Sequence, residues 1–142
     1  MKLKIKDWKE ETAKKGYHST TIGNVKVIDN FHIPQLKLKR RVWIYLPPDY
    51  EMSGKRYPTL YMHDGQNLFD EATSYVGEWK VDKILDYLFY KQHLEGVIVV
   101  GIDNGSEKRL SEYVPSKKGR QYAKFLAETL KPFIDEHFRT LP

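Results

Sequence analysis

The sequence predicts an α/β fold, a mostly parallel sheet preceded by antiparallel strands, on the strength of three observations. Residues 36–46 alternate between apolar and charged side chains, which is the pattern of a half-buried strand. Residues 97–101 are continuously β-branched up to a glycine, as expected of a parallel strand covered on both faces. Apolar residues at helical spacing follow the later strands, and this alternation indicates parallel strands joined by helices.

The N-terminal part of the chain has the weakest pattern. We expect residues 1–16 to form a helix fragment or a loosely held arm. Residues 20–28 contain two β-rich stretches, which Gly23 and Asn24 separate.

The alternating segment, residues 36–46, predicts a strand with one buried face. Leucine, valine and isoleucine occupy one side, and the other side carries lysine, arginine, Trp43 and Tyr45. We expect this strand to pair antiparallel with its neighbour. Pro47 and Pro48 end it.

The following elements alternate between strand and helix. A polar turn leads into a short strand over residues 59–62. A helix is predicted from Val81, because apolar residues at i, i+3, i+4 and i+7 form the buried stripe of a surface helix. These residues are Val81, Ile84, Leu85 and Leu88. Gly96 ends this unit, and the strand of residues 97–101 comes next.

A long helix is predicted to end the chain. Its apolar face consists of Tyr122, Phe125, Leu126, Leu130, Phe133 and Ile134. Pro132 removes a backbone donor inside it, so we expect a kink or a split near Lys131. A crossover helix normally returns the chain to the sheet, but no strand follows in residues 139–142. We therefore expect the strand of residues 97–101 to keep an open edge that favours self-association.

Length and composition restrict the class of protein. The chain has 142 residues, of which 40% are hydrophobic and 30% charged, and this indicates one soluble globular domain. No apolar stretch approaches the roughly 20 residues needed to cross a bilayer, and the basic N-terminus is a poor signal peptide. The sequence contains no cysteine, which excludes thiol chemistry. We expect a cytoplasmic protein without a membrane partner.

The net charge of +5 raises the question of nucleic-acid binding. The basic residues form two clusters: Lys2, Lys4, Lys6, Lys9, Lys14 and Lys15, and then Lys37, Lys39, Arg40 and Arg41. A nucleic-acid interface would require them on one face with interleaved aromatic residues. Acidic residues dilute the first cluster and apolar residues alternate with the second, so we interpret both as solvated faces and expect no nucleic-acid partner.

Residues 57–70, YPTLYMHDGQNLFD, mark the most informative strand end. The apolar run stops abruptly at His63, Asp64 and Gly65. Ligands of open α/β sheets bind outside the carboxyl ends of the strands, so this boundary is a candidate chemical site.

Six ordered segments carry a family resemblance. They read RRVWIYLPPDY (40–50), YPTLYMHDGQNLFD (57–70), GEW (77–79), VIVVGIDN (97–104), RLSEYVP (109–115) and KPFIDEHFRTLP (131–142). Through them the chain resembles the Putative esterase family of α/β-hydrolases, which includes enterochelin-esterase-like and esterase-D-like enzymes. The resemblance implies a three-layer α/β-hydrolase fold and a serine carboxylesterase with a Ser-Asp-His triad. It implies a small-molecule ester substrate, and neither a metal nor an organic cofactor.

The catalytic triad of such an enzyme is missing from this sequence. The family's nucleophile lies in a G-x-S-x-G turn, on the strand after the helix where this chain ends. None of the six serines has glycines at both the −2 and +2 positions; they are Ser19, Ser53, Ser74, Ser106, Ser111 and Ser116. The five histidines, His18, His32, His63, His93 and His137, precede that turn, so none matches the catalytic one. We interpret residues 1–142 as the N-terminal portion of one hydrolase domain and expect the isolated chain to be inactive.

The oxyanion hole is the part of the site that the resemblance carries over. One of its donors comes from the loop after the third strand of the hydrolase sheet, which here implies the backbone amide of Gln66. Glycine at residue 65 allows a sharp turn that brings this amide close to a substrate oxygen. We expect Gln66→Ala to have a mild effect and Gly65→Val a severe one.

Seven further residues are candidates for substrate binding: His63, Asp64, Asn67, Trp79, Asp103, Asn104 and Arg109. We interpret His63 as a structural hydrogen-bonding residue that fixes the loop. For Asp64 and Asp70 we favour loop capping over a carboxylate pair or a metal site.

The remaining candidates have two readings each. Trp79 either lines the substrate pocket or packs under the following helix. Asp103 and Asn104 follow a central strand at the edge where substrates bind. Arg109 either binds an anionic substrate group or, as we favour, forms a pair with Glu112 that holds its loop.

Two other functions stay open at this point. The first is a non-catalytic ligand-binding domain on the hydrolase framework, for example for a glycan or a siderophore-like ligand. The second is a basic nucleic-acid-binding domain that uses the strand around residues 37–41, which a salt-dependent shift with DNA or RNA would support.

Overall fold

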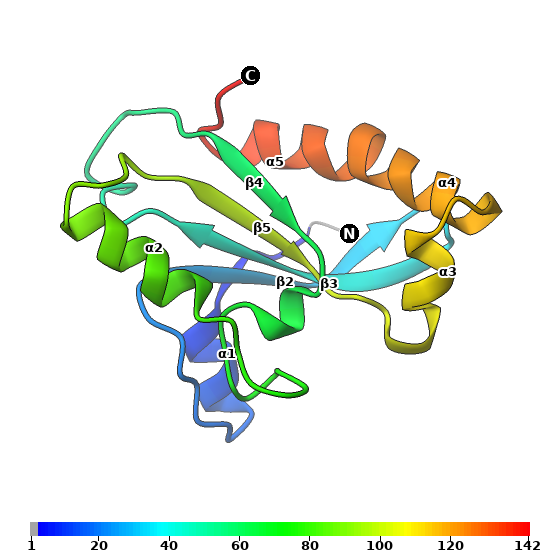
Figure 1. Ribbon diagram of the computed structural model, residues 1–142, viewed down its shortest axis with the longest axis horizontal. Helices are drawn as coiled ribbons and strands as arrows, with labels where there is room; N and C mark the ends of the chain where they lie inside the picture. The colour runs from blue at the N-terminus through cyan, green and yellow to red at the C-terminus, as the bar shows by residue number, and fades with distance from the viewer. Residues whose placement is uncertain (1–2) are drawn as a thin grey trace.

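A five-stranded mixed sheet forms the centre of the computed structural model, which describes residues 3–142 (Figure 1). The strands lie in the order β1-β2-β3-β5-β4. Their bounds are Lys6–Asp7 for β1, Asn24–Ile33 for β2, Leu38–Leu46 for β3, Thr59–Met62 for β4 and Ile98–Ile102 for β5. The pairs β1–β2, β2–β3 and β3–β5 are antiparallel, and β4–β5 is parallel. The antiparallel beginning and the later parallel strands therefore agree with the expected hydrolase-type fold.

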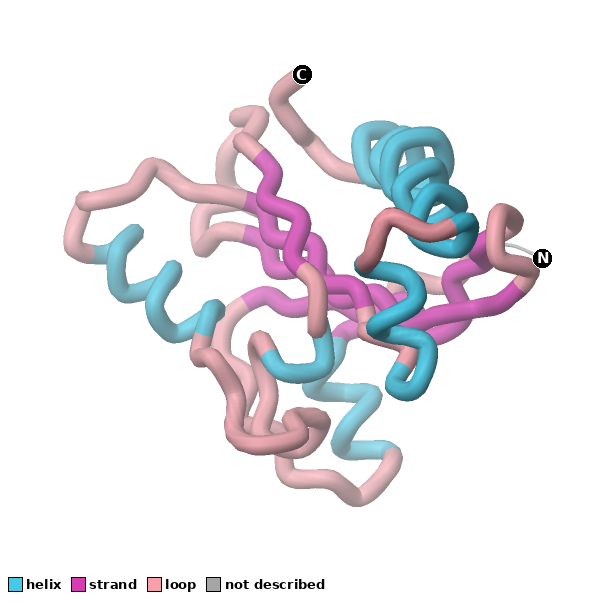
Figure 2. Tube along the Cα trace, turned by 45° about the vertical axis from the view of Figure 1, so that its right-hand side comes forward, coloured by secondary structure: helices cyan, strands magenta, loops and turns pink. Residues whose placement is uncertain are grey.

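Helices cover both faces of this sheet and complete a three-layer arrangement (Figure 2). The regular helices are α1 (Trp8–Lys14), α2 (Val81–Tyr90), α3 (Arg109–Tyr113), α4 (Lys117–Lys124) and α5 (Lys131–His137), with short 3₁₀ turns η1 (Gly65–Asn67) and η2 (Ser106–Lys108). One face packs on apolar residues of α4, α5 and the turn between them. The opposite face packs on Trp8 of α1 and on Val81 and Leu85 of α2.

Strand β5 lies inside the sheet, so our expectation of an open edge there was wrong. Val100 of β5 pairs with Ile44 of β3 on one side and with Tyr61 of β4 on the other. The order of the strands along the chain does not reveal this arrangement. After β4 the chain passes through α2 and returns to the sheet as β5, which lies between the two earlier strands β3 and β4. Strand β4 is the outer strand on this side of the sheet.

Strand β3 is buried on both faces, which corrects the prediction of a half-buried strand. Trp43 and Tyr45 lie on the side expected to be solvated, but they are 2% and 1% exposed. Trp43 packs edge-on against Trp8, with 5.9 Å between ring centroids. Arg40 is also buried, at 5% exposure, so it is not part of a solvated basic face. Helix α1 covers the aromatic side of the strand, which local alternation cannot reveal.

The N-terminal segment forms the helix rather than the loose arm. Strand β1 pairs with β2, and Trp8 at the start of α1 is 1% exposed. The first two residues of the expected arm lie outside the described residues. After α1 the two β-rich stretches expected around Gly23 prove to be one strand, β2, which starts at Asn24 and has a bulge between Ile28 and Phe31.

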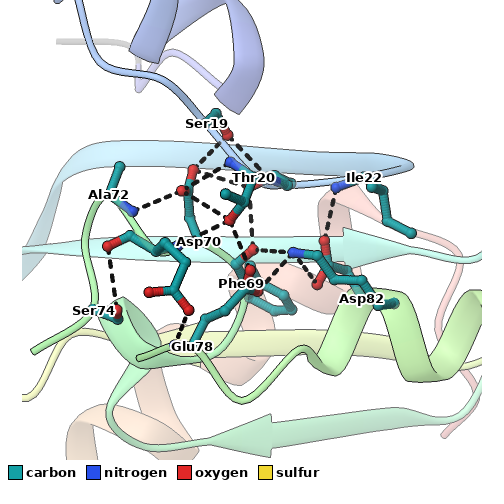
Figure 3. A network of polar contacts seen from close by, with 12 residues as sticks. Ser19, Thr20, Ile22, Phe69, Asp70, Ala72, Ser74, Glu78 and Asp82 are labelled. Atoms are coloured by element: carbon teal, nitrogen blue, oxygen red, sulfur yellow. Dashed lines mark hydrogen bonds and ion pairs between the residues drawn. The ribbon is translucent and has the colours of Figure 1, made fainter. Parts of the chain in front are cut away.

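Asp70 ties this N-terminal segment to the loop after β4 (Figure 3). Its buried carboxylate accepts hydrogen bonds from Trp8 Nε1 at 2.7 Å, Thr21 Oγ1 at 3.1 Å and the Ala72 amide at 2.9 Å. Burial alone would raise the pKa of Asp70, but hydrogen bonds, led by that from Ser19, hold the pKa below its usual value. The preference for a capping role over a metal site agrees with these contacts.

The long C-terminal helix is not split at Pro132, because the backbone at Lys124, Leu130 and Lys131 stays helical from α4 to α5; the irregularity near the proline is a π-helical segment. This segment, η3 (Phe125–Leu130), lies between α4 and α5, and Pro132 lies in the first turn of α5. Proline has no backbone N–H, so it interrupts the hydrogen-bond ladder at this point, next to the π-helical segment.

Helix α2 begins at Val81 as predicted, but its apolar stripe is only partly covered. Val81 and Leu85 pack on the core, whereas Ile84 is 53% exposed. Asp82, in the first turn, is fully buried and accepts a hydrogen bond from the Ile22 amide at 2.8 Å. Among the described helices, none has both the length and the apolar character that a bilayer crossing requires.

Candidate functional site

The loops after β4 and β5 meet at the carboxyl ends of these parallel strands and enclose a cavity of about 500 Å³. Its lining includes six of the residues selected from the sequence: Asp64, Gln66, Asn67, Asp103, Asn104 and Arg109. Thr73, Ser74, Tyr75 and Ser106 complete it. Sequence reasoning missed these four, although their position in polar loops next to the site was a usable signal.

Asp64 adopts a left-handed backbone conformation, with φ of 55° and ψ of 44°. Non-glycine residues seldom adopt this conformation, and aspartate tolerates it better than most. Its carboxylate accepts two hydrogen bonds from Arg109, at 2.9 and 3.0 Å, and one from Asn104 Nδ2 at 3.0 Å. These bonds, that of Arg109 foremost, hold the pKa of Asp64 below its usual value despite partial burial. The sharp turn thus occurs at Asp64 and not at Gly65.

Gly65 is required by a close approach to the sheet. A Cβ atom at this position would lie 2.7 Å from the carbonyl carbon of Gly101 and 2.8 Å from the amide nitrogen of Ile102. Both are backbone atoms of β5, so they cannot rotate away. Gly101 is needed for the same close approach from the side of β5, since a Cβ at residue 101 would lie 3.2 Å from the Cα of Gly65. The two glycines let η1 lie directly against β5.

Gln66 follows in this first 3₁₀ turn. Its carbonyl oxygen accepts a hydrogen bond from Thr73 Oγ1 at 2.7 Å, and its side-chain Oε1 accepts one from the Asn104 amide at 3.3 Å. Its own backbone N–H has no acceptor among the described residues, as is usual for the first amides of a helical turn. Hydrogen bonds therefore hold both the carbonyl and the side chain of Gln66. The backbone N–H of Gln66 has no acceptor among the described residues and can donate to a ligand.

Asn67 and Trp79 join the site to the segment before α2. The Asn67 carbonyl accepts a hydrogen bond from the Trp79 amide at 2.7 Å, and its Oδ1 accepts one from the Tyr75 amide at 3.0 Å. The Trp79 side chain is 58% exposed and does not line the cavity. This exposure disagrees with packing under the helix, and a role of Trp79 in substrate binding stays a prediction.

His63 lies outside the cavity, against the helices on the other side of the loop. Its Nδ1 is 3.1 Å from the Tyr122 hydroxyl, and its ring is 4.5 Å from that of Tyr113. Burial lowers the pKa of His63, which favours the neutral ring. The contact with Tyr122 is of the kind expected of a structural residue, and the exposed His63 also lines a second pocket beside Tyr113.

Arg109 does not pair with Glu112, contrary to the interpretation that we favoured. It pairs with Asp64, while Glu112 accepts hydrogen bonds from Arg40 at 2.5 and 3.0 Å. The side chains of Arg40 and Glu112 are 4% and 1% exposed. Sequence analysis could not find this pair, because the partners are 72 residues apart and Arg40 lies within a basic run.

Comparison with known proteins identifies the family. The model of the family described as Putative esterase matches residues 33–142. The chain belongs to this esterase family. A curated relative, the uncharacterized protein YbbA of Bacillus subtilis, is 33% identical over 76 residues, which cover 54% of this chain and 26% of YbbA.

Three solved structures show where the chain fits in the esterase fold. An IroE-like serine hydrolase from Shewanella oneidensis matches 82% of this chain and 40% of its own, with 22% identity and a TM-score of 0.65. The enterobactin esterase FES from Shigella flexneri, in the presence of enterobactin, matches with 20% identity and a TM-score of 0.65 over 85% of this chain and 28% of its own. The BES protein from Bacillus cereus matches with 16% identity and a TM-score of 0.66 over 87% of this chain and 50% of its own. The chain thus spans half or less of the length of these relatives.

Proposed function

We propose that this chain supplies the oxyanion-stabilising side of a serine carboxylesterase site, and that residues following Pro142 in a longer protein supply the nucleophile. The observation that carries this proposal is the available N–H of Gln66, fixed at the carboxyl end of β4 by Thr73 and Asn104. Membership of the esterase family supports the reaction class.

The end of the chain supports the position proposed for the nucleophile. The Tyr57 amide donates to the Arg139 carbonyl at 2.9 Å, and the Leu141 amide donates to the Tyr57 carbonyl at 2.8 Å. Tyr57 and Thr140 form a parallel bridge, so the segment after α5 starts to run beside β4. A strand continuing in this direction would end at the same edge as His63 and Gln66, where a serine could face the Gln66 amide.

In the proposed reaction, a serine activated by a histidine attacks the ester carbonyl and forms a tetrahedral oxyanion. The Gln66 N–H and the amide after the serine donate hydrogen bonds to this oxyanion. Collapse expels the alcohol and leaves an acyl-enzyme, which water then hydrolyses. The contribution of this chain lies in the fixed position of the Gln66 donor, which needs no rearrangement as the charge develops.

The test compares the 142-residue chain with a longer protein whose coding sequence continues beyond Pro142. We expect the longer protein to hydrolyse a p-nitrophenyl acyl ester and to be labelled by a fluorophosphonate on a serine beyond residue 142. We expect neither from the 142-residue chain. Turnover abolished by labelling of a serine within residues 1–142 would overturn the proposal. Because FES was solved in the presence of enterobactin, enterobactin is the first natural ester to test.

A pair of variants in the longer protein isolates the Gln66 amide. Gln66→Ala keeps the N–H and loses only the side-chain bond to Asn104, so it should lower kcat/KM mildly, whereas Gln66→Pro also removes the N–H. Proline is tolerated in the first turn of a helix, so the fold should persist. We expect Gln66→Pro to lower kcat by about 10²–10³-fold. Equal activity of the two folded variants would exclude this amide as an oxyanion donor.

A second candidate function is ligand binding without catalysis, favoured by a cavity of about 500 Å³ that this chain forms by itself. Calorimetric titration of the 142-residue chain with a hydrolysed siderophore fragment would test it. Saturable binding, together with no turnover by the longer protein, would favour this function over the esterase.

A further inference from the structure

Helix α3 contacts the loop after β4 through two of its side chains. Arg109 donates from Nε and Nη2 to the two carboxylate oxygens of Asp64, at 2.9 and 3.0 Å. The Tyr113 ring packs against His63 with 4.5 Å between ring centroids, and the Arg109 guanidinium lies 5.2 Å from the centre of the Tyr113 ring. The helix therefore holds two consecutive residues of the loop.

The helix is itself fixed to the sheet from its buried side. Glu112 accepts two hydrogen bonds from Arg40 of β3 at 2.5 and 3.0 Å. Gly105, at the start of this segment, packs on the same guanidinium, since a Cβ there would lie 2.5 Å from Arg40 Nη2. The core thus fixes the helix that carries Arg109, whose own side chain is 49% exposed.

The loop needs such support at Asp64. This residue has a left-handed backbone, with φ of 55°, directly before Gly65 and Gln66. Most residues prefer the right-handed or extended regions, so the side-chain bonds of Asp64 help to hold it in the left-handed one. Relaxation there would redirect the following peptide groups, including the Gln66 N–H.

We propose that Arg109 is a positioning residue whose ion pair with Asp64 holds the turn that presents the Gln66 amide. Two of its donors are engaged by this carboxylate, so the role differs from binding of a substrate anion. The catalytic meaning of this proposal rests on the proposed esterase function, whereas the structural coupling can be measured without any hydrolysis.

Several charged or titratable groups lie around Asp64. Arg109 and Tyr113 face it from α3, and His63 precedes it in the loop. Asn104 donates to it from the loop after β5, where Asp103 lines the same cavity. The pKa of Asp64 is below its usual value, so the ion pair forms above that pKa and is lost as the pH falls through it.

The test uses the isotopically labelled 142-residue chain and NMR spectroscopy. The Cα and Cβ shifts of Asp64 report its backbone conformation, and the Gln66 amide shift reports the donor. The Asp64 titration is followed through its carboxylate carbon. Three variants are compared. Arg109→Gln removes the positive charge, and Arg109→Lys keeps the charge but cannot donate the two parallel hydrogen bonds to Asp64. Lys108→Gln is the control, because it removes one positive charge from the adjacent residue.

In Arg109→Gln we expect the left-handed shifts of Asp64 to be lost, the Gln66 amide peak to move and the Asp64 midpoint to rise. Arg109→Lys should restore part of each change, and Lys108→Gln should match the wild type. Unchanged Asp64 and Gln66 signals in a folded Arg109→Gln chain would overturn the proposal. So would equal changes in Lys108→Gln. Failure of the esterase function alone would leave these shifts in place.

Discussion

The role of Gly65 follows from the lack of space for a side chain at its Cα. A side chain there would meet the carbonyl carbon of Gly101 at 2.7 Å and the amide nitrogen of Ile102 at 2.8 Å, both in the backbone of the central strand β5. Backbone atoms of a paired strand cannot move without loss of sheet hydrogen bonds. The glycine therefore fixes the distance between the candidate oxyanion loop and the sheet.

We expect Gly65→Val to lower the free energy of unfolding by about 3 kcal/mol, as overpacking of a dense core does. Gly54→Val is the matched control, because a Cβ at Gly54 has no atom within 4 Å. Urea denaturation of the 142-residue chain measures both. Equal stability of the two variants would show that η1 can move away from β5 at little cost.

At the scale of elements, helix α3 depends on one buried ion pair. Arg40 of β3 and Glu112 of α3 are nearly inaccessible to water, and two hydrogen bonds join them. Removal of one partner would leave an uncompensated charge in the interior, whereas removal of both charges can be nearly neutral.

Arg40→Met should therefore lower the free energy of unfolding by about 3–5 kcal/mol, and the double variant Arg40→Met, Glu112→Leu should recover most of that loss. Arg41→Met is the control on the same strand. Its side chain is 29% exposed, pairs with Asp29 at 3.1 Å and lies 5.3 Å from the centre of the Trp8 ring, so a smaller loss of about 1–2 kcal/mol is expected. Chemical denaturation of the four proteins checks this, and a double variant as unstable as Arg40→Met would contradict it.

These elements show what local sequence pattern can and cannot predict. Strand β4 and the start of α2 were predicted at their observed residues, because neighbouring side chains encode periodicity. The burial of Trp43 depends on a partner far along the chain, and alternation assigned it to the solvated side. Arg40 has the parity of the buried side, but its basic neighbours led us to interpret it as solvated. The same limit applies at the site. The motif placed Gly65 and Gln66 together, but the left-handed Asp64 and its bond to Arg109 required the packing of α3.

At the scale of the whole molecule, strand order decides which surface is open. Strand β5 is inside the sheet, so the exposed edge belongs to β4. The segment after α5 covers only the start of this edge, at Tyr57. Over Thr59–Met62 no described strand pairs with the outer side, and this stretch contains no charged residue. Natural sheets usually protect such edges with lysine, proline or a covering segment.

The 142-residue chain should therefore self-associate through β4. Leu60 lies in the middle of this edge and is 49% exposed, so Leu60→Lys should place a charge where a second strand would approach. Tyr17→Lys is the control, since Tyr17 is 60% exposed in a different part of the molecule. Sedimentation velocity over a concentration series should give a mass that rises for the wild type and for Tyr17→Lys and stays monomeric for Leu60→Lys. A wild-type chain that remains monomeric throughout, or two variants that behave alike, would show that the edge of β4 does not drive association.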